Sequence, residues 1–181
     1  MQSNTGQACS TQQASPRIII PTRLTGQPPP LFVHSRPFLL RKTMLKNPFL
    51  NQSFDPNLKW FIGVFNIYDR EEELGAELEK YNPNNRMDRE ELIKNYALDL
   101  SYLSYRHKHA LIKSLECSLN DKNYNFQKLF EINDDESASW PRAEWYELEN
   151  PREFLHEIYL LAQFFWKDDL QKAALEDPST W

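Results

Sequence analysis

Hydrophobic and polar residues alternate with a helical period over most of the chain after residue 43. Apolar side chains recur every three or four positions from residue 88 to 119, and residues 152–166 are apolar over most of a helical circumference. Such spacing gathers apolar side chains on one side of a helix. Shorter helices are predicted at residues 124–132 and 168–175. The pattern predicts a mainly α fold, with a single compact helical bundle over residues 44–181.

Capping residues mark where several of these helices begin. Asn150 precedes Pro151, and Glu153 stands three residues after Asn150, which is the arrangement of a capped helix start. Asp88 and Glu91 form the same pattern, and Asp55 precedes Pro56. Residues 81–85 contain a proline and three asparagines and predict a break between helices.

The stretch between the first start signal and this break has two interpretations. Residues 57–81 are compatible with one long helix. Residues 58–68, LKWFIGVFNIY, are also rich enough in aromatic and branched side chains to form a buried strand, and periodicity alone does not separate the two. An α+β fold with a strand near residues 58–68 is therefore the alternative fold.

Residues 1–43 differ from the remainder in composition. They contain six prolines, five basic residues and no acidic residue, and they lack hydrophobic periodicity. We expect no packed structure from such a segment. Three interpretations remain: an arginine-rich targeting peptide, a disordered proline-rich interaction tail, or a segment upstream of a native start at Met44. We favour the third, because the residues just before Met44 can be encoded by a purine-rich ribosome-binding sequence.

Composition excludes several classes of protein. The 181 residues include only four glycines, which argues against glycine-rich phosphate loops, and Cys9 and Cys117 are too few for a disulfide framework. A cytoplasmic location is the simplest expectation. No apolar run approaches the roughly 18 residues that a transmembrane helix needs. Residues 44–181 hold all 26 acids and 16 of the 21 bases, a net charge of −10 that disfavours direct binding of nucleic acid.

Three side chains raise the question of a metal site: His107, His109 and Cys117. On a helix, residues two apart point in different directions, so His107 and His109 cannot chelate one ion together. Cys117 lies two to three turns further along. His107 falls within the apolar arc, where the simplest interpretation is a neutral histidine hydrogen-bonded to a neighbouring helix. The alternative is a functional base in a cleft. Cys117 is expected to pack at the edge of the core.

The pair Glu153 and His156 has the spacing found in di-iron helical bundles, but that site needs the pair twice. Neither His107 nor His109 has a glutamate three residues before it. Glu153, His156, Gln163 and Lys167 are instead predicted to form a polar strip along one helix. The chain also lacks a nucleophile elbow, a phosphate loop and a dinucleotide-binding fingerprint. We therefore predict no catalytic residue, no metal and no cofactor.

The most distinctive segment is acidic and aromatic, and it spans residues 131–157. It carries nine acids against Arg142 and Arg152. Tryptophans within an acidic surface are typical of protein-binding sites. The alternative is that both pack into the core while the acids solvate a loop. The predicted partner-binding residues are Asp134, Asp135, Glu136, Trp140, Glu144, Trp145, Tyr146, Glu147 and Glu149. A second acidic cluster consists of Asp69, Glu71, Glu72, Glu73, Glu77 and Glu79.

The sequence favours a small acidic helical protein that binds and neutralises or regulates a basic protein, of the immunity-protein or antitoxin type, and a nuclease toxin is one such partner. Charge of this sign steers a basic partner and speeds its association. The first alternative is an enzyme or ligand-binding bundle with a pocket around His107. The second is a structural oligomer subunit joined through its apolar central helix.

Overall fold

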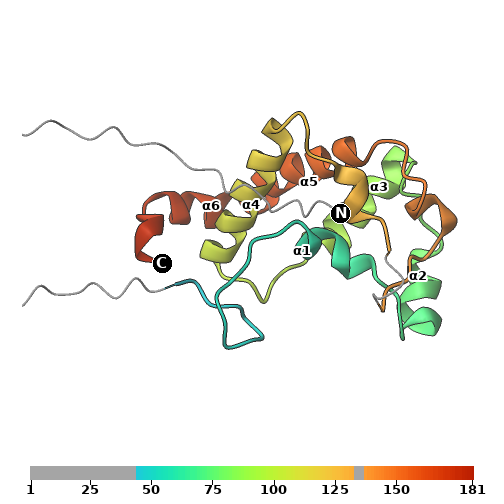
Figure 1. Cartoon of the computed structure of the whole chain (residues 1–181), viewed down its shortest axis with the longest axis horizontal. Coiled ribbons are helices and arrows are strands. Elements are labelled where there is room, and N and C mark those ends of the chain that lie inside the picture. The colour runs from blue at the N-terminus through green and yellow to red at the C-terminus, as the bar shows by residue number, and fades with distance from the viewer. Residues whose placement is uncertain (1–43, 133–136) are drawn as a thin grey trace, which may run out of the picture. The chain divides into compact units, whose positions relative to one another are not determined.

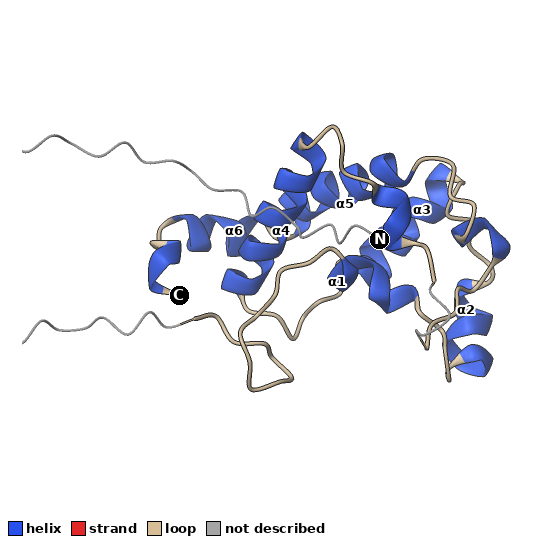
Figure 2. Ribbon diagram, viewed as in Figure 1, coloured by secondary structure: helices blue, strands red, loops and turns tan. Residues whose placement is uncertain are grey.

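The computed structural model describes residues 44–132 and 137–181. Within these residues every regular element is helical, and the only β contact is an isolated antiparallel bridge between Lys46 and Ser53 (Figure 2). The predicted mainly α fold is confirmed. The interpretations of residues 1–43 lie outside the described residues. The helices are α1 (Lys59–Ile62), α2 (Ala76–Leu78), α3 (Arg86–Leu92), α4 (Tyr105–Asn120), α5 (Pro151–Phe165) and α6 (Lys167–Ala174).

The alternative strand near residues 58–68 is wrong. Residues 59–62 form α1, and Gly63–Phe65 continues it as a 3₁₀ turn. Leu58, Phe61, Ile62 and Phe65 are all buried. Their spacing of three, four and seven residues is that of one helical face, whereas a strand would bury alternate residues.

A single helix over residues 57–81 is wrong as well. The backbone leaves the helical conformation after Phe65, and Asp69 adopts a φ of 61°. That left-handed conformation is incompatible with a continuing right-handed helix. The chain resumes with a π turn at Glu71–Gly75, which leads into α2. The acidic residues 71–79 consequently belong to a short separate element.

The predicted helix over residues 88–119 is divided in two. Asn85, and not Asp88, caps α3: its side chain accepts hydrogen bonds from the backbone N–H groups of Met87 and Asp88. After α3 a π turn at Ile93–Ala97 leads into a loop, and α4 begins after Ser104. The loop inserts Leu98, Leu100 and Leu103 into the core. One continuous helix would not direct all three inward, so burial of these leucines explains the interruption.

Helix α5 begins where the capping pattern predicts. The backbone N–H of Glu153 donates to Asn150 Oδ1 over 3.1 Å, and Asn150 Nδ2 donates back to Glu153 Oε2 over 3.0 Å. Phe154, Leu155, Ile158 and Ala162 form its buried face. This helix packs against α4, α6, the π turn at Ile93–Ala97 and a 3₁₀ turn at Phe126–Leu129.

The C-terminal part of the chain packs against α4, where Figure 1 shows α4 and α6 side by side. Lys108 Nζ lies 2.6 Å from Asp169 Oδ2, and Arg106 Nε lies 2.7 Å from Glu176 Oε2. Trp181 is buried, and its ring meets His109 edge-on at 5.3 Å. Among the helices of the described residues, none combines the length and apolar character needed to cross a bilayer.

Candidate functional site

The structure brings the two acidic segments of the sequence together. The backbone N–H of Ile67 donates to Ser139 O over 2.9 Å, and Arg142 Nη1 donates to Glu79 O over 2.9 Å. Further along, the backbone N–H of Glu149 donates to Asn84 Oδ1 over 3.0 Å. In Figure 1 the orange segment after residue 137 correspondingly runs beside α2. Residues 69–79 and 142–149 therefore belong to one region of the surface.

We call the exposed carboxylates and the exposed tyrosine of this region the acidic face: Asp69, Glu71, Glu72, Glu73, Glu77, Glu79, Tyr146, Glu147 and Glu149. Residues 69–80 and 142–149 together hold nine acids and only three bases, Arg70, Lys80 and Arg142. Like charges held this close repel one another, and a basic partner would relieve that repulsion.

Glu144 and Glu77 each accept hydrogen bonds from side chains of the same chain. The guanidinium of Arg142 donates from Nη2 and Nε to the two carboxylate oxygens of Glu144, over 2.5 and 3.1 Å. This pairing holds the pKa of Glu144 below its ordinary value and offsets its charge. Tyr96 Oη donates to Glu77 Oε1 over 2.6 Å, and burial together with this carboxylate raises the pKa of Tyr96. Glu77 is thereby fixed at the inner edge of the face.

The two tryptophans predicted to bind a partner are core residues. Trp145 is fully buried among Phe65, Phe130 and Phe154, and its ring stacks on that of Trp140 at a centroid distance of 6.0 Å. The indole N–H of Trp140, itself 8% exposed, donates to Phe130 O over 2.8 Å. Both tryptophans therefore anchor the acidic segment to the core, and neither is exposed enough to contact a partner.

The remaining predicted partner-binding residues have different positions. Tyr146, Glu147 and Glu149 are exposed, and Tyr146 is 47% exposed. Asp134, Asp135 and Glu136 lie outside the described residues. Three of the predicted partner-binding residues therefore have exposed side chains in the acidic face. The face also includes the cluster at residues 69–79, which the sequence analysis treated as a separate patch.

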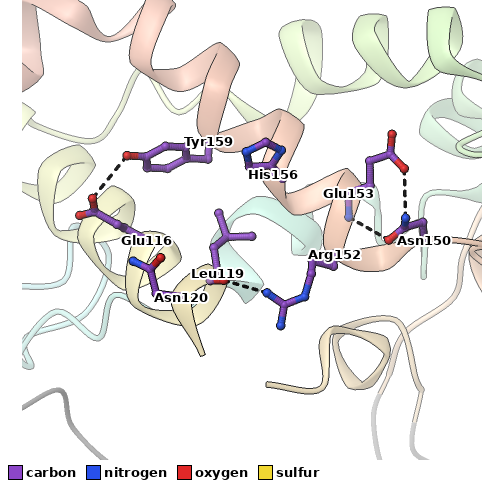
Figure 3. A pocket seen from close by; sticks show the side chains of 8 residues that line it. All are labelled: Glu116, Leu119, Asn120, Asn150, Arg152, Glu153, His156 and Tyr159. Atoms are coloured by element: carbon purple, nitrogen blue, oxygen red, sulfur yellow. Dashed lines mark hydrogen bonds between the residues drawn. The ribbon is translucent and has the colours of Figure 1, made fainter. Parts of the chain in front are cut away.

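An open cleft of about 620 Å³ lies between α4 and the start of α5 (Figure 3). Arg152 forms one end of it: its guanidinium donates to Leu119 O over 2.8 Å and to Asp121 O over 2.7 Å. These are carbonyl groups at the C-terminus of α4, where a cation also favours the helix dipole. The lining residues are Glu116, Leu119, Asn120, Asn150, Arg152, Glu153, His156 and Tyr159.

The opposite end of the cleft is formed by Tyr159, whose hydroxyl lies 3.5 Å from Glu116 Oε1. His156 is exposed between the two ends. The predicted polar strip named Glu153 and His156 but missed Glu116 and Tyr159. Forty-three residues separate Glu116 from Tyr159 in sequence, and only the packing of α4 on α5 brings them together.

His107 is a structural residue in this fold. Its Nε2 lies 2.7 Å from Lys46 O and must donate to that carbonyl, and Nδ1 lies 2.7 Å from Ser104 Oγ. Phe54 meets the imidazole edge-on at 4.6 Å. With both nitrogens occupied, the ring has no atom to offer a ligand. The neighbour that His107 binds is the extended segment at residues 44–54 and not another helix.

We expect His107→Leu to lower the free energy of unfolding by about 1–2 kcal/mol, because two hydrogen bonds of a half-buried side chain are lost. The N–H of Phe54, which donates to Leu45 O over 2.7 Å, should also lose protection from hydrogen exchange as residues 44–54 detach from α4. Urea denaturation and amide exchange measure the two effects. His109→Leu is the control and should leave the Phe54 amide protected; equal protection in both variants would contradict this role of His107.

The other side chains considered for metal binding lie apart. His109 contacts Trp181, whereas His107 contacts Lys46 and Phe54. Burial lowers the pKa of His109, and the charge of Lys113 adds to this effect. Cys117 is exposed, so its expected packing at the core edge is wrong. In the described parts of the chain, no three or more His, Cys, Asp or Glu side chains converge as metal ligands would.

The acidic face and the cleft are therefore features of the described surface that are suited to binding. Comparison with protein-family models, with characterised proteins and with solved structures finds no match to this chain.

Proposed function

We propose that this chain binds a basic protein through the acidic face and neutralises or regulates that protein. The observation that supports the proposal is the union of residues 69–79 and 142–149 in one exposed region with nine acids and three bases. The net charge of −10 over residues 44–181 adds long-range attraction for a basic partner.

Binding of this kind needs no chemistry from the chain. Electrostatic attraction brings the partner to the face, and charge-assisted hydrogen bonds between its Arg or Lys side chains and the carboxylates set specificity. Tyr146 supplies an exposed aromatic ring among these carboxylates. Trp140 and Trp145 hold the backbone beneath it in place and so fix where Glu147 and Glu149 stand.

A nuclease is the partner class that we propose, because an enzyme that binds phosphates presents a basic surface that an acidic protein can occupy. The chain would then act in the manner of an immunity protein or antitoxin. Inhibition of the nuclease by the full-length chain is the activity that this finer proposal requires.

Charge reversal at single positions tests the proposal. The full-length chain is used to capture a partner from its host, and the partner is then purified for titration. We expect Glu72→Lys and Glu147→Lys each to weaken binding about tenfold at low salt, since each places a cation opposite a basic surface. The difference should shrink at high salt because salt screens exposed charges.

Asp168→Lys provides the matched control. Asp168 is exposed on α6, at the end of the described structure opposite α2 in Figure 1, and its reversal changes the net charge by the same amount. The control should bind as the unmodified chain does. Equal weakening in all three variants would reduce the attraction to non-specific charge, and undiminished binding by Glu72→Lys and Glu147→Lys would refute the acidic face as the docking surface.

A further inference from the structure

An open depression of about 490 Å³ lies where α1 meets the loop at residues 47–57. Trp60, Gly63 and Val64 line it from α1 and from the 3₁₀ turn that continues α1. Residues three and four apart share one face of a helix, so these three residues lie on the same side. Tyr102 lines the depression from the loop before α4. The depression shares no lining residue with the cleft between α4 and α5, and none of its residues belongs to the acidic face.

Two aromatic rings form the apolar part of the depression. The indole N–H of Trp60 donates to Asp55 O over 2.9 Å, which fixes the orientation of the ring. Tyr102 is 47% exposed, and its ring centroid lies 6.5 Å from that of Trp60. Phe49 packs against both rings, at centroid distances of 6.4 Å from Trp60 and 5.0 Å from Tyr102. The three rings therefore hold one another in place.

Polar side chains line the depression beside these rings. They comprise one carboxylate, three amides and two cations, so together they offer both hydrogen-bond donors and acceptors. The amide of Gln52 and the hydroxyl of Tyr102 have no hydrogen-bond partner among the described residues, so both can bond a ligand. The six polar side chains are those of Asn47, Gln52, Asp55, Asn57, Lys59 and Arg70.

Gly63 keeps one wall of the depression open. Its backbone is helical, with a φ of −61°, a conformation that any residue adopts. A Cβ atom at this position would meet no heavy atom within 4 Å beyond its immediate neighbours in the helix, so the packing of the described residues does not require glycine. Glycine also destabilises a helix relative to alanine. Close approach of a ligand to the backbone is a role that glycine serves and a larger residue does not.

We infer that this depression binds a neutral carbohydrate, with one sugar ring packed against Trp60 and Tyr102. The C–H groups on the face of a sugar ring are slightly positive, and the face of an aromatic ring is negative, so the two attract each other. The hydroxyl groups around the sugar both donate and accept hydrogen bonds, which suits the mixture of amides, carboxylate and cations beside the rings. The absence of a side chain at Gly63 leaves space for the sugar against the backbone.

The charges around the depression favour a neutral ligand. Lys59 and Arg70 would repel a cation. An anion would meet Asp55 within the depression, Asp69 and Glu71 on either side of Arg70 in the chain, and the net charge of −10 over residues 44–181. A carbohydrate avoids both penalties, because its hydroxyl groups form hydrogen bonds with carboxylates and with cations alike.

Titration of the full-length, ¹⁵N-labelled chain with neutral oligosaccharides tests the inference. The probes are the disaccharides and tetrasaccharides of glucose, mannose, galactose and N-acetylglucosamine. We expect at least one series to bind and to shift the amide resonance of Gly63 and the indole N–H resonance of Trp60, which Trp60→Phe identifies. Salt should leave the dissociation constant unchanged, because no ion pair forms. Binding of none of these probes would overturn the inference, as would tighter binding of adenosine monophosphate that shifts the same two resonances.

Gly63→Leu separates the site from the fold. The new side chain enters open space, so the urea midpoint should equal or exceed that of the unmodified chain, whereas saccharide affinity should fall about tenfold or more. Tyr102→Ala should weaken binding by a similar factor, because it removes one of the two rings. Phe165→Ala is the matched control, since Phe165 is 50% exposed on α5 and lies outside the depression.

Undiminished affinity in Gly63→Leu would contradict this site, and so would equal weakening by Phe165→Ala and Tyr102→Ala. The inference does not rest on the proposed function. All three variants leave the acidic face unchanged and should still bind the basic partner, so the two proposals fail or succeed separately.

Discussion

Trp145→Ala is expected to lower the free energy of unfolding by about 4 kcal/mol. Trp145 is fully buried and contacts the rings of Phe65, Phe130 and Phe154. Alanine removes this aromatic contact area and leaves a cavity that rigid neighbouring rings cannot close. Since a domain of this size is typically stable by only about 5–15 kcal/mol, the loss should be conspicuous in urea denaturation.

The conservative variant separates packing from hydrogen bonding. The indole N–H of Trp145 has no acceptor among the described residues. Trp145→Phe removes this buried donor while it keeps most of the aromatic volume, so the expected loss is only about 1 kcal/mol. A loss as large as that of alanine would show that the indole itself, and not the packed ring, stabilises the fold.

Arg89→Ala is expected to cost about 3–5 kcal/mol, because it leaves a partly buried carboxylate without its cation. Arg89 is 8% exposed, and its Nε and Nη2 each donate to Glu157 over 2.7 Å, one to each carboxylate oxygen. The hydrogen bonds that Arg89 donates to the Glu157 carboxylate raise the pKa of Arg89, against the opposing effect of burial. This pair joins α3 to α5, and urea denaturation of the variant measures its contribution.

A double variant separates the free-energy cost of the unpaired carboxylate from the cost of lost packing. Arg89→Met combined with Glu157→Leu removes both charges and keeps apolar volume at the site, and such replacements are often neutral or stabilising. We expect the double variant to unfold at nearly the urea concentration of the unmodified chain. Comparable destabilisation in the single and double variants would instead assign the effect to lost packing of the arginine stem.

Helix positions that depend on neighbouring residues were predictable from the sequence. The start of α5 follows from Asn150, Pro151 and Glu153, because the caps are made by side chains within four residues of the groups they satisfy. The helical class follows from hydrophobic spacing for the same local reason. The divergence of His107 and His109 also required only helical geometry, since both lie within α4.

Interruptions of helices depended on packing across the chain. The loop before α4 exists because Leu98, Leu100 and Leu103 reach the core, where the other buried residues come from distant elements of the chain. The turn at Asp69 likewise accompanies the hydrogen bond from Ile67 to Ser139, which joins residues far apart in sequence. Local propensity did not indicate either feature, because the stabilising partners are distant.

The sequence by itself determined the helical class, the capped start of α5, the acidic character of residues 44–181 and the exposure of Glu147 and Glu149, because composition, periodicity and capping act through local chemistry. Tertiary structure alone decided that Trp140 and Trp145 are core residues, that Glu116 and Tyr159 share a cleft, and that the two acidic segments form one face. Each of these depends on contacts between segments separated by tens of residues. The sequence shows a carboxylate or a tryptophan in the same way whether its side chain is exposed or packed against a distant segment.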